Sequence, residues 1–449
     1  MHVNNFLWAL INTAITMAVP LLILPIQVRL LTQNELGWWS IWVSLVGLIG
    51  ILTSSVNLTI LRFASYSNSE MVGEATVSRG LNRLTLWNAS LSIGFRLACV
   101  VVLIASIVGA CYAFLSEYFF LDRVIIPWII LIFSVGFLSV SNILPSFLQG
   151  VGGQASSFKY LLFSRVGQVV TVIGALYFNL KLFSYPLSIL VFSCLCVYFH
   201  GKSKEISAVR GAGPNENHEG MRNLRKSLVK PIVYQVVSAS GGWLNSVSHV
   251  IIIGLYLGPT YAAMYGISLQ IAHFFTSISI IPVSIILPGL GGDFIAKKFY
   301  AFRRKARYAV LYSSVMFIGL SAIFMICGLS MTELYLNNFR FISRGQFILL
   351  LFIVYSEFIS RSVCGQILFA ANDARHSMPF FISGVISAFL CCIILKFTNL
   401  GIWGGIIAQI SVQMSYNSWK WPLQLIRLLD PKSMELECRS GLVQKQYAH

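Results

Sequence analysis

The sequence predicts an all-α polytopic membrane protein, and three observations support this class. The chain has 449 residues, of which 57% are hydrophobic and only 10% are charged, whereas a soluble domain carries roughly 25% charged residues. Apolar runs of about 20 residues or more recur from one end of the chain to the other. These runs are continuous and do not alternate, so helices rather than barrel strands are expected to cross the membrane.

Twelve apolar runs are long enough to be spanning helices. They cover about residues 6–30, 37–61, 87–115, 124–149, 158–178, 182–200, 231–256, 259–289, 308–330, 346–370, 377–397 and 399–424. Six runs lie on each side of a polar segment near the middle of the chain. Because six crossings return the chain to its starting side, we expect two six-helix bundles related by a pseudo-twofold axis along the membrane normal.

The domain organisation follows from that polar segment, residues 201–230, which reads GKSKEISAVRGAGPNENHEGMRNLRKSLVK. We expect an N-terminal six-helix bundle at residues 1–200 and a cytoplasmic linker at 201–230. A C-terminal six-helix bundle is expected at residues 231–424, followed by a cytoplasmic tail at 425–449. The segments between the remaining runs are short, so the helices themselves must carry the function.

The formal net charge is +17, and its distribution indicates a membrane topology rather than a nucleic-acid partner. Most of the 32 Lys and Arg residues fall in the segments that are cytoplasmic if the N-terminus is cytoplasmic, as the positive-inside rule requires. Both termini are then cytoplasmic. The first apolar run is too long for the core of a signal peptide and lacks a basic flank, so we expect it to be a spanning helix.

Glu357 and Arg361 interrupt the apolar stretch LLFIVYSEFISRSVCGQILF at residues 350–369. An ionised side chain in the middle of a bilayer costs roughly 2.5–3.5 kcal/mol on insertion scales. The spacing of four residues places both groups on one helix face, where they can pair. Two interpretations remain open: a substrate or proton site, and a pair that fixes neighbouring helices together.

A polar stripe follows one face of the span at residues 231–256. Its members are Gln235, Ser238, Gly242, Asn245 and His249, at offsets 0, 3, 7, 10 and 14. Such a stripe either lines an aqueous cavity or packs on another polar helix through hydrogen bonds.

Two polar side chains in the next span, Gln270 and His273, are spaced so that they could face the same space. A single histidine in a membrane helix is a candidate proton carrier, but it is more often a hydrogen-bonded packing residue.

Arginines are unusually frequent within and at the ends of the first spans. Arg29 and Arg62 end the first two spans, Arg96 lies within the third and Arg165 within the fifth. Together with Arg361, the embedded arginines outnumber the embedded carboxylate Glu357. Because guanidinium binds phosphate in a bidentate manner, this excess suggests an anionic cargo. Snorkelling to the interface, or packing against backbone carbonyls, is the alternative.

The sequence lacks the motifs of several enzyme classes. No Walker A segment is present, so ATP hydrolysis by this chain is not expected, and neither a G-x-S-x-G nor an H-E-x-x-H motif occurs. The nine cysteines lie mostly in apolar runs and show no metal-ligand spacing with histidine. We therefore expect no catalytic residue, no metal and no cofactor other than a proton or sodium gradient.

Three segments resemble a known family of polysaccharide exporters. VRLLTQNELGWWSIW, after the first span, is similar to an R-x-L-G-x-x-x-x-G-hydrophobic pattern, although Thr32 stands where glycine is usual. FLQGVGGQASSFKYLLFSRVGQVVTVIGALYF resembles the family's segment after the fourth span, and GIWGGIIAQISVQ its last-span glycine pattern. The chain resembles the O-antigen (Wzx-type) flippases of the multidrug/oligosaccharidyl-lipid/polysaccharide exporter superfamily.

The resemblance implies a transporter that works by alternating access in the bacterial inner membrane. Its implied cargo is an undecaprenyl-pyrophosphate-linked oligosaccharide, an O-antigen or related lipopolysaccharide repeat unit, and polysaccharide polymerase machinery is a possible partner. The family's cationic cavity is bordered by helices one, two, seven and eight. In that arrangement the arginines and the polar stripe named above would border the cavity. Glu357 would couple the motion to an ion gradient or hold Arg361 in position.

Two rival functions remain. A cation-coupled multidrug exporter of the same superfamily would prefer carboxylates in its cavity, and Glu357 is the main candidate here. An integral-membrane glycan polymerase or ligase usually needs a sizeable external loop for its catalytic groups, and the longest external segment here is short. The sequence therefore favours the flippase.

Overall fold

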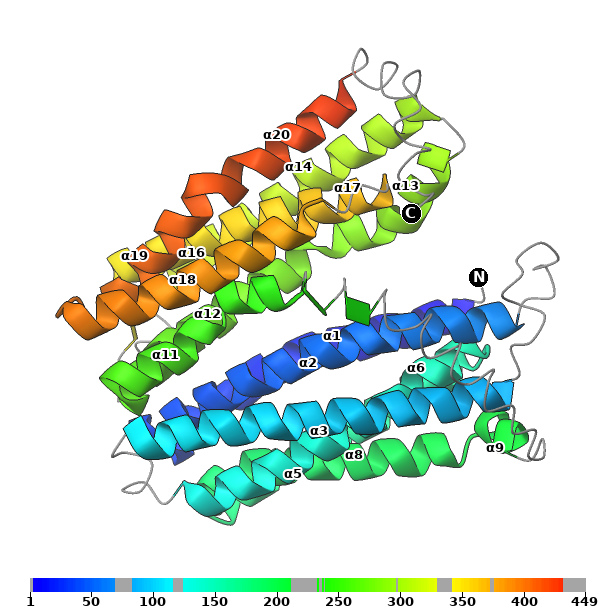
Figure 1. Ribbon diagram of the computed structural model, residues 1–449, viewed down its shortest axis with the longest axis horizontal. Coiled ribbons are helices and arrows are strands. Elements are labelled where there is room, and N and C mark those ends of the chain that lie inside the picture. Colours follow the sequence, from blue (N-terminus) through cyan, green and yellow to red (C-terminus); the bar gives the residue numbers. More distant parts are fainter. Residues whose placement is uncertain are drawn as a thin grey trace. The chain divides into compact units, whose positions relative to one another are not determined.

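The computed structural model describes residues 3–68, 83–115, 124–210, 232–233, 236–237, 239–295, 298–328, 341–371 and 375–430. Within these ranges the chain is built of helices joined by short turns (Figure 1). Nine helices of the described part are long and apolar enough to cross a membrane. The chain divides into two compact units.

The N-terminal unit consists mainly of Met1–Trp243 and Val250–Gly266. Its helices are α1 (Val3–Leu30), α2 (Gln33–Asn68), α3 (Arg83–Leu115), α5 (Ile125–Ser141), α6 (Ile143–Gly150), α7 (Gln154–Tyr177), α8 (Ser184–Gly201) and α9 (Lys204–Arg210). Helix α1 packs on α7, α2 on α6, and α5 on both α3 and α8 (Figure 1).

Aromatic side chains fill one part of the N-terminal core. Trp38 of α2 lies edge-on to Tyr112 of α3, with ring centroids 5.3 Å apart, and Trp42 lies edge-on to Trp128 of α5 at 6.3 Å. The buried hydroxyl of Tyr112 donates a hydrogen bond of 2.5 Å to the carbonyl of Ile251, so it is not left unsatisfied. This contact ties α3 to α11 (Ser248–Leu257), part of which belongs to this unit.

The turn between α1 and α2 explains the residue that departs from the exporter pattern. Thr32 and Glu35 form a capping box: the Thr32 amide donates to Glu35 Oε2 at 2.8 Å, and the Glu35 amide donates to Thr32 Oγ1 at 3.3 Å. Glu35 also pairs with Lys181 at 3.0 Å. Threonine therefore starts α2 here, a role that glycine fills less well because it has no side chain.

The C-terminal unit consists of Leu244–His249, Ile267–Tyr335 and Phe341–His449. Its elements are α12 (Pro259–Ser279, shared with the first unit), α13 (Ile281–Ile295), α14 (Phe299–Ile323), η3 (Phe324–Gly328), α16 (Arg344–Glu357), η4 (Phe358–Cys364), α17 (Gly365–Ala370), α18 (Ser377–Phe397), α19 (Ile402–Val412), η5 (Gln413–Asn417) and α20 (Ser418–Leu429). The segments η3, η4 and η5 are π-helical.

Packing in the C-terminal unit brings the last helices around the middle of the α16–η4–α17 helix. Helix α18 packs on α19, α13 packs on α14, and α20 packs on η4 (Figure 1). Helix α16 begins with a capping box in which the Gln346 amide donates to Ser343 Oγ and the Ser343 amide donates to Gln346 Oε1. The buried ring of Phe317 from α14 packs against Phe358 of η4.

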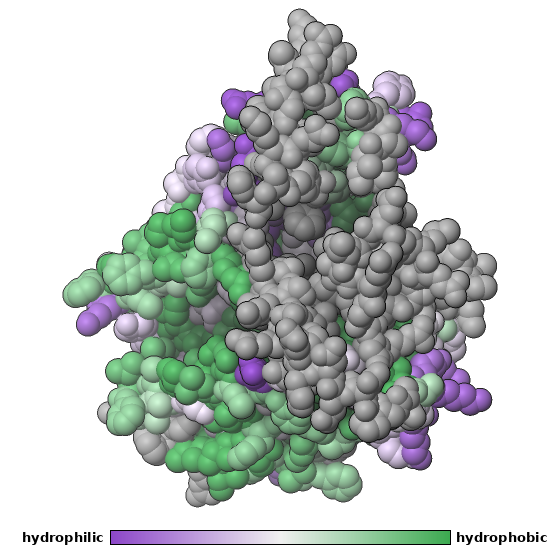
Figure 2. Space-filling view, turned by 45° about the vertical axis from the view of Figure 1, so that its right-hand side comes forward, coloured by the Kyte–Doolittle hydropathy of each residue, from purple (hydrophilic) through white to green (hydrophobic). Residues whose placement is uncertain are grey.

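Large apolar side chains cover much of the outer surface. On α3 the exposed residues include Phe95, Leu103 and Ile107, and on α14 they include Leu311 and Val315. Figure 2 shows broad hydrophobic areas on the visible surface. A surface of this kind is expected when lipid rather than water is the solvent.

The predicted class, an all-α multi-pass membrane protein, is confirmed. The twelve-span count stays a prediction beside the nine described helices that meet the length and hydropathy criteria. The predicted domain boundaries also stay a prediction, because most of the linker at 201–230 and of the tail at 425–449 lies outside the described residues.

Candidate functional site

The ion pair predicted from the sequence forms inside the C-terminal unit. Glu357 is the last residue of α16, and Arg361 lies one turn later in the π-helical segment η4. Arg361 Nε lies 3.2 Å from Glu357 Oε1, while 5% of the Glu357 side chain and 32% of the Arg361 side chain are exposed. The carboxylate is therefore buried, while about a third of the Arg361 side chain stays exposed.

Asn245 binds the other oxygen of the Glu357 carboxylate. Its Nδ2 donates to Glu357 Oε2 at 3.3 Å and to Gln413 Oε1 at 3.2 Å. Asn245 and Gln413 are both fully buried. Because a buried carboxylate is costly unless it is paired and hydrogen-bonded, this arrangement explains how Glu357 is tolerated in an apolar surrounding.

The two π-helical segments of this region are joined directly by side chains. Gln413 of η5 donates from Nε2 to Ser360 Oγ of η4 at 3.1 Å, and Ser360 Oγ donates to the Glu357 carbonyl at 3.2 Å. A π-turn widens the helix and displaces its side chains, and such turns are frequent at functional sites. Here both wide turns fall at the same buried polar centre.

The polar network continues into α18 and α20. Asn417, the last residue of η5, donates to Ser383 Oγ at 2.6 Å, and its Oδ1 accepts from Trp421 Nε1 at 3.1 Å. Asn417 is fully buried. We refer to Asn245, Glu357, Ser360, Arg361, Gln413, Asn417 and Ser383 as the C-unit polar cluster.

Two histidines lie beside the C-unit polar cluster. His249 is fully buried, and its Nε2 lies 3.3 Å from Ser387 Oγ of α18. His273 lies on α12 and is half-buried. His249 Nδ1 and His273 Nε2 are buried atoms without a hydrogen-bond partner among the described residues. These two nitrogens could accept or donate a proton if water or cargo entered.

The structure places only some of the predicted site residues together. Asn245, His249, His273, Glu357 and Arg361 all belong to the C-terminal unit. A turn at residues 246–247 lies between Asn245 and His249, and α11 begins at Ser248, so these two residues do not share one uninterrupted helix as the continuous face predicted for the 231–256 span requires.

Other predicted residues are not tested at this cluster. Gln270 is half-buried on α12, Gln235 lies outside the described residues, and the side chain of Arg62 is likewise outside them.

The arginines of the N-terminal unit have different surroundings. Arg29 is exposed at the end of α1. Arg96 is exposed on the same face of α3 as Leu103 and Ile107, an apolar outer face of that unit. Arg96 therefore lies on an exposed face of α3, and its role in holding cargo stays a prediction.

Arg165 of α7 is half-buried and has partners. It donates from Nη1 to Gln168 Oε1 at 3.0 Å, and its guanidinium lies 4.7 Å from the ring centroid of Phe192 on α8. A guanidinium over an aromatic face is stabilised by the ring quadrupole. Packing between α7 and α8 therefore explains Arg165 without a ligand.

Sequence reasoning missed Gln413, Asn417, Ser360 and Ser383. A signal was available for two of them: Gln409, Gln413 and Asn417 recur every four residues through an apolar run, and all three are fully buried. This is the same kind of stripe as the one noted around Asn245. The two stripes meet where Asn245 contacts Gln413.

The C-unit polar cluster is suited to charge exchange rather than to metal binding. Among the described residues no group of three or more His, Cys, Asp or Glu side chains could hold a metal ion. The cluster contains one carboxylate and one guanidinium that neutralise each other, together with the side-chain amides of Asn245, Gln413 and Asn417. An anion that approached Arg361 on its accessible side would compete with Glu357 for the same cation.

Comparisons with known proteins give matches at the level of structure. No protein-family model and no curated protein sequence matches the chain. An inward-facing multidrug resistance MATE family transporter of the MOP superfamily aligns with a TM-score of 0.62 and 13% identity, covering 92% of this chain and 98% of that chain. An outward-facing one gives a TM-score of 0.60 and 14% identity, covering 95% of both chains.

A third similar structure comes from Pyrococcus furiosus. It is a MOP superfamily transporter whose reversed binding-pocket polarity was taken to suggest a different function, and it aligns with a TM-score of 0.52 and 14% identity over 95% of this chain and 96% of that one. At such identities the likeness establishes the fold. The chain has the all-helical membrane fold of MOP superfamily transporters and is structurally similar to MATE transporters over nearly its whole length.

Proposed function

We propose that the chain is an alternating-access transporter that flips an undecaprenyl-pyrophosphate-linked oligosaccharide across the bacterial inner membrane. The fold supports transport, because the chain aligns about equally well with an inward-facing and an outward-facing MOP transporter. The twelve-span, two-bundle topology with cytoplasmic termini belongs to this proposal. The cargo is argued from the chemistry of the C-unit polar cluster.

The observation that carries the proposal is the half-open ion pair of Glu357 and Arg361. A structural pair would be expected to bury both partners, yet Arg361 keeps 32% of its side chain exposed while Glu357 is buried. The guanidinium can thus meet a ligand while its countercharge stays fixed by Asn245. A pyrophosphate offers several oxygens to a planar guanidinium, which suits bidentate binding.

Exchange of partners would link binding to motion. When pyrophosphate takes Arg361, Glu357 loses its cation and keeps only the Asn245 hydrogen bond, an unfavourable state for a buried carboxylate. Uptake of a proton by Glu357 removes that cost. Glu357 is therefore the proposed coupling residue, and the His273 nitrogen beside Arg361 is a proposed route for the proton.

The remaining predicted residues enter the proposal in a supporting role. Arg29, Arg62 and Arg96 would attract the anionic headgroup at the membrane surface, while Gln235, Gln270 and His249 would contact sugar hydroxyls. Arg165 is retained as a weaker candidate because Gln168 and Phe192 already occupy its guanidinium. The lipid tail would stay in the bilayer.

A second function is favoured by one observation, because the similar solved structures include multidrug resistance transporters. In that case Glu357 would bind an organic cation, and the positive charge of Arg361 would repel this cargo.

Proteoliposomes separate the two functions. Purified protein should translocate a fluorescent undecaprenyl-pyrophosphate-linked glycan and should not accumulate ethidium under a proton gradient. Ethidium transport without glycan translocation would overturn the flippase and support the exporter. Accumulation of lipid-linked repeat units on the cytoplasmic face after gene deletion is the matching result in cells.

A further inference from the structure

An apolar groove lies on the C-terminal unit, beside the segment η4 that carries Arg361. It encloses about 540 Å³ between α14, η4 and α20. Apolar side chains form its walls, among them Leu311 of α14 and Leu425 and Ile426 of α20. Leu311 and Ile426 are more than half exposed, so the groove opens toward the surrounding lipid.

Two charged residues stand at one end of this groove. Arg307 of α14 and Asp430, directly after α20, are its charged lining residues. Arg307, Leu311 and Ser314 follow one face of α14, so the cation continues directly into the apolar wall. The neighbouring Lys305 pairs with Asp293 at 2.6 Å, whereas Arg307 has no ion-pair partner among the described residues.

The floor of the groove is the π-helical segment η4. Ile359 and Cys364 line the groove, and both flank the pair Ser360 and Arg361 of the C-unit polar cluster. Ser360 is fully buried and faces Gln413. One side of the wide turn therefore carries the polar cluster, while Ile359 and Cys364 border the groove on another side.

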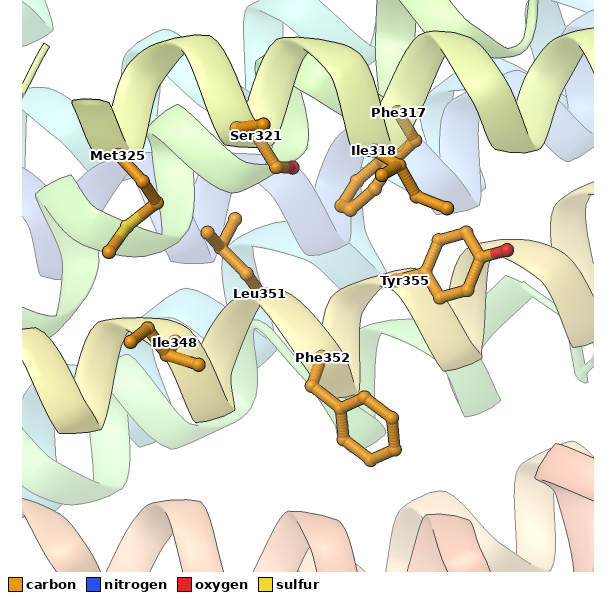
Figure 3. Close-up of a pocket in the computed structure, with 9 residues that line it drawn as sticks. Phe317, Ile318, Ser321, Met325, Ile348, Leu351, Phe352 and Tyr355 are labelled. Carbon is orange, nitrogen blue, oxygen red and sulfur yellow. The ribbon is translucent and has the colours of Figure 1, made fainter. Parts of the chain in front are cut away.

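A second groove on the same unit provides a comparison. It encloses about 290 Å³ between α14, η3 and α16 and is lined by residues such as Ile318, Ile348 and Phe352 (Figure 3). Its only lining groups with polar atoms are hydroxyls, at Ser321 and Tyr355. Both grooves offer apolar walls to lipid, but only the first places opposite charges at one end.

We infer that the groove of α14, η4 and α20 is a binding site for a phospholipid of the ethanolamine type. Its acyl chain lies along Leu311 and Ile426, its phosphate contacts Arg307, and its ammonium shares Asp430 as a counter-ion. Arginine is the residue best suited to phosphate, and a carboxylate at the same end disfavours a purely anionic headgroup. An acyl chain against Ile359 and Cys364 would then support the turn that carries Arg361.

Photolabelling in proteoliposomes tests this site without any transport measurement, so its outcome is independent of the proposed function. The experiment compares two lipid probes that carry a diazirine in the acyl chain, phosphatidylethanolamine and phosphatidylglycerol. Mass spectrometry then maps the labelled peptides. Phosphatidylethanolamine should label the Leu311 and Ile359 peptides preferentially, whereas the Ile348 peptide of the second groove should not distinguish the headgroups.

Variants of the two charged residues test which of them contacts the lipid headgroup. Arg307→Ala should reduce labelling of the first groove roughly tenfold, the effect of losing one charge-assisted hydrogen bond. Arg304→Ala, on the same helix but outside the groove, is the matched control and should leave labelling unchanged. Asp430→Asn should abolish the preference for phosphatidylethanolamine.

Three results would overturn the inference. The first is equal labelling of both grooves regardless of headgroup, which would mean bulk lipid. The second is labelling that Arg307→Ala does not change. The third is displacement of the probe by undecaprenyl phosphate but not by phosphatidylethanolamine, which would assign the groove to the cargo's own tail.

Discussion

Gln413 donates a hydrogen bond of 3.1 Å to Ser360, and this bond joins the π-helical segments η4 and η5 of the C-terminal unit. Gln413 also accepts from Asn245, so it stands between the residue that holds the buried carboxylate and the turn that carries the guanidinium. The geometry of the ion pair therefore depends on a residue that carries no charge.

Replacing Gln413 by Leu removes both of these bonds while keeping a similar size. We expect the free energy of unfolding to fall by about 1–3 kcal/mol, because Asn245 and Ser360 are buried and lose a partner. Thermal denaturation in detergent measures the effect. Ser415→Ala, in the same segment, removes a hydroxyl bonded to the Val412 carbonyl of its own helix and should change little; equal losses for the two variants would argue against the linking role.

Glu357 should respond differently to two substitutions. Glu357→Ala leaves Arg361 without a counter-ion and Asn245 without one acceptor, and we expect a loss of about 3–5 kcal/mol in stability. Glu357→Gln keeps an oxygen that can accept from Asn245, so its loss of stability should be clearly smaller. It imitates the protonated carboxyl permanently, and we expect uncoupled or arrested transport. Chemical denaturation measures the stability of both variants, and translocation assays on equal amounts of folded protein measure their transport. Equal behaviour of the two variants would contradict the assigned role of Glu357.

Gly37 permits a close approach of backbones in the N-terminal unit. A Cβ at this position would lie 1.9 Å from the carbonyl oxygen of Pro259, at the start of α12. Gly37→Ala should therefore destabilise the protein by about 3 kcal/mol or more, since backbone has to move. Gly50→Ala on the same helix meets nothing within 4 Å and should be neutral or slightly stabilising. Fluorescence size-exclusion profiles after mild heating distinguish the two, and similar profiles would contradict the close packing.

Arg165 can be assigned to packing or to cargo by one conservative change. Arg165→Lys keeps the positive charge but loses the planar stacking on Phe192 and the present hydrogen bond to Gln168. If packing is its role, stability should fall by about 0.5–2 kcal/mol while transport per folded molecule stays close to normal. Unchanged stability with lost transport would instead assign Arg165 to the cargo.

The membrane class and the principal ion pair could be predicted because each depends on local spacing. Long apolar runs predict spanning helices, and a separation of four residues places Glu357 and Arg361 on one helix face. The same reasoning predicts the stripe containing Asn245 and His249, but it does not decide whether the stripe lines an aqueous cavity or packs on another polar helix.

The partners of that stripe could not be predicted in the same way. Asn245 contacts Glu357 across 112 positions of sequence, and which helices meet is decided by packing rather than by periodicity. The π-helical turns at η4 and η5 lie where Gln413 and Ser360 join the two segments, and no local sequence motif predicts them. Arg96 shows the converse limit, since its sequence position suggested an interior residue and the structure places it on the exposed face of α3.

The most direct test of the account is the affinity of the purified protein for undecaprenyl pyrophosphate, measured for the wild type, Arg361→Ala and Lys396→Ala. The last variant removes an exposed cation at the end of α18 and serves as the control. We predict that Arg361→Ala weakens binding about tenfold or more, as expected for the loss of a charge-assisted bidentate contact, while Lys396→Ala binds normally. Equal affinity in all three proteins would contradict the claim that Arg361 holds the pyrophosphate.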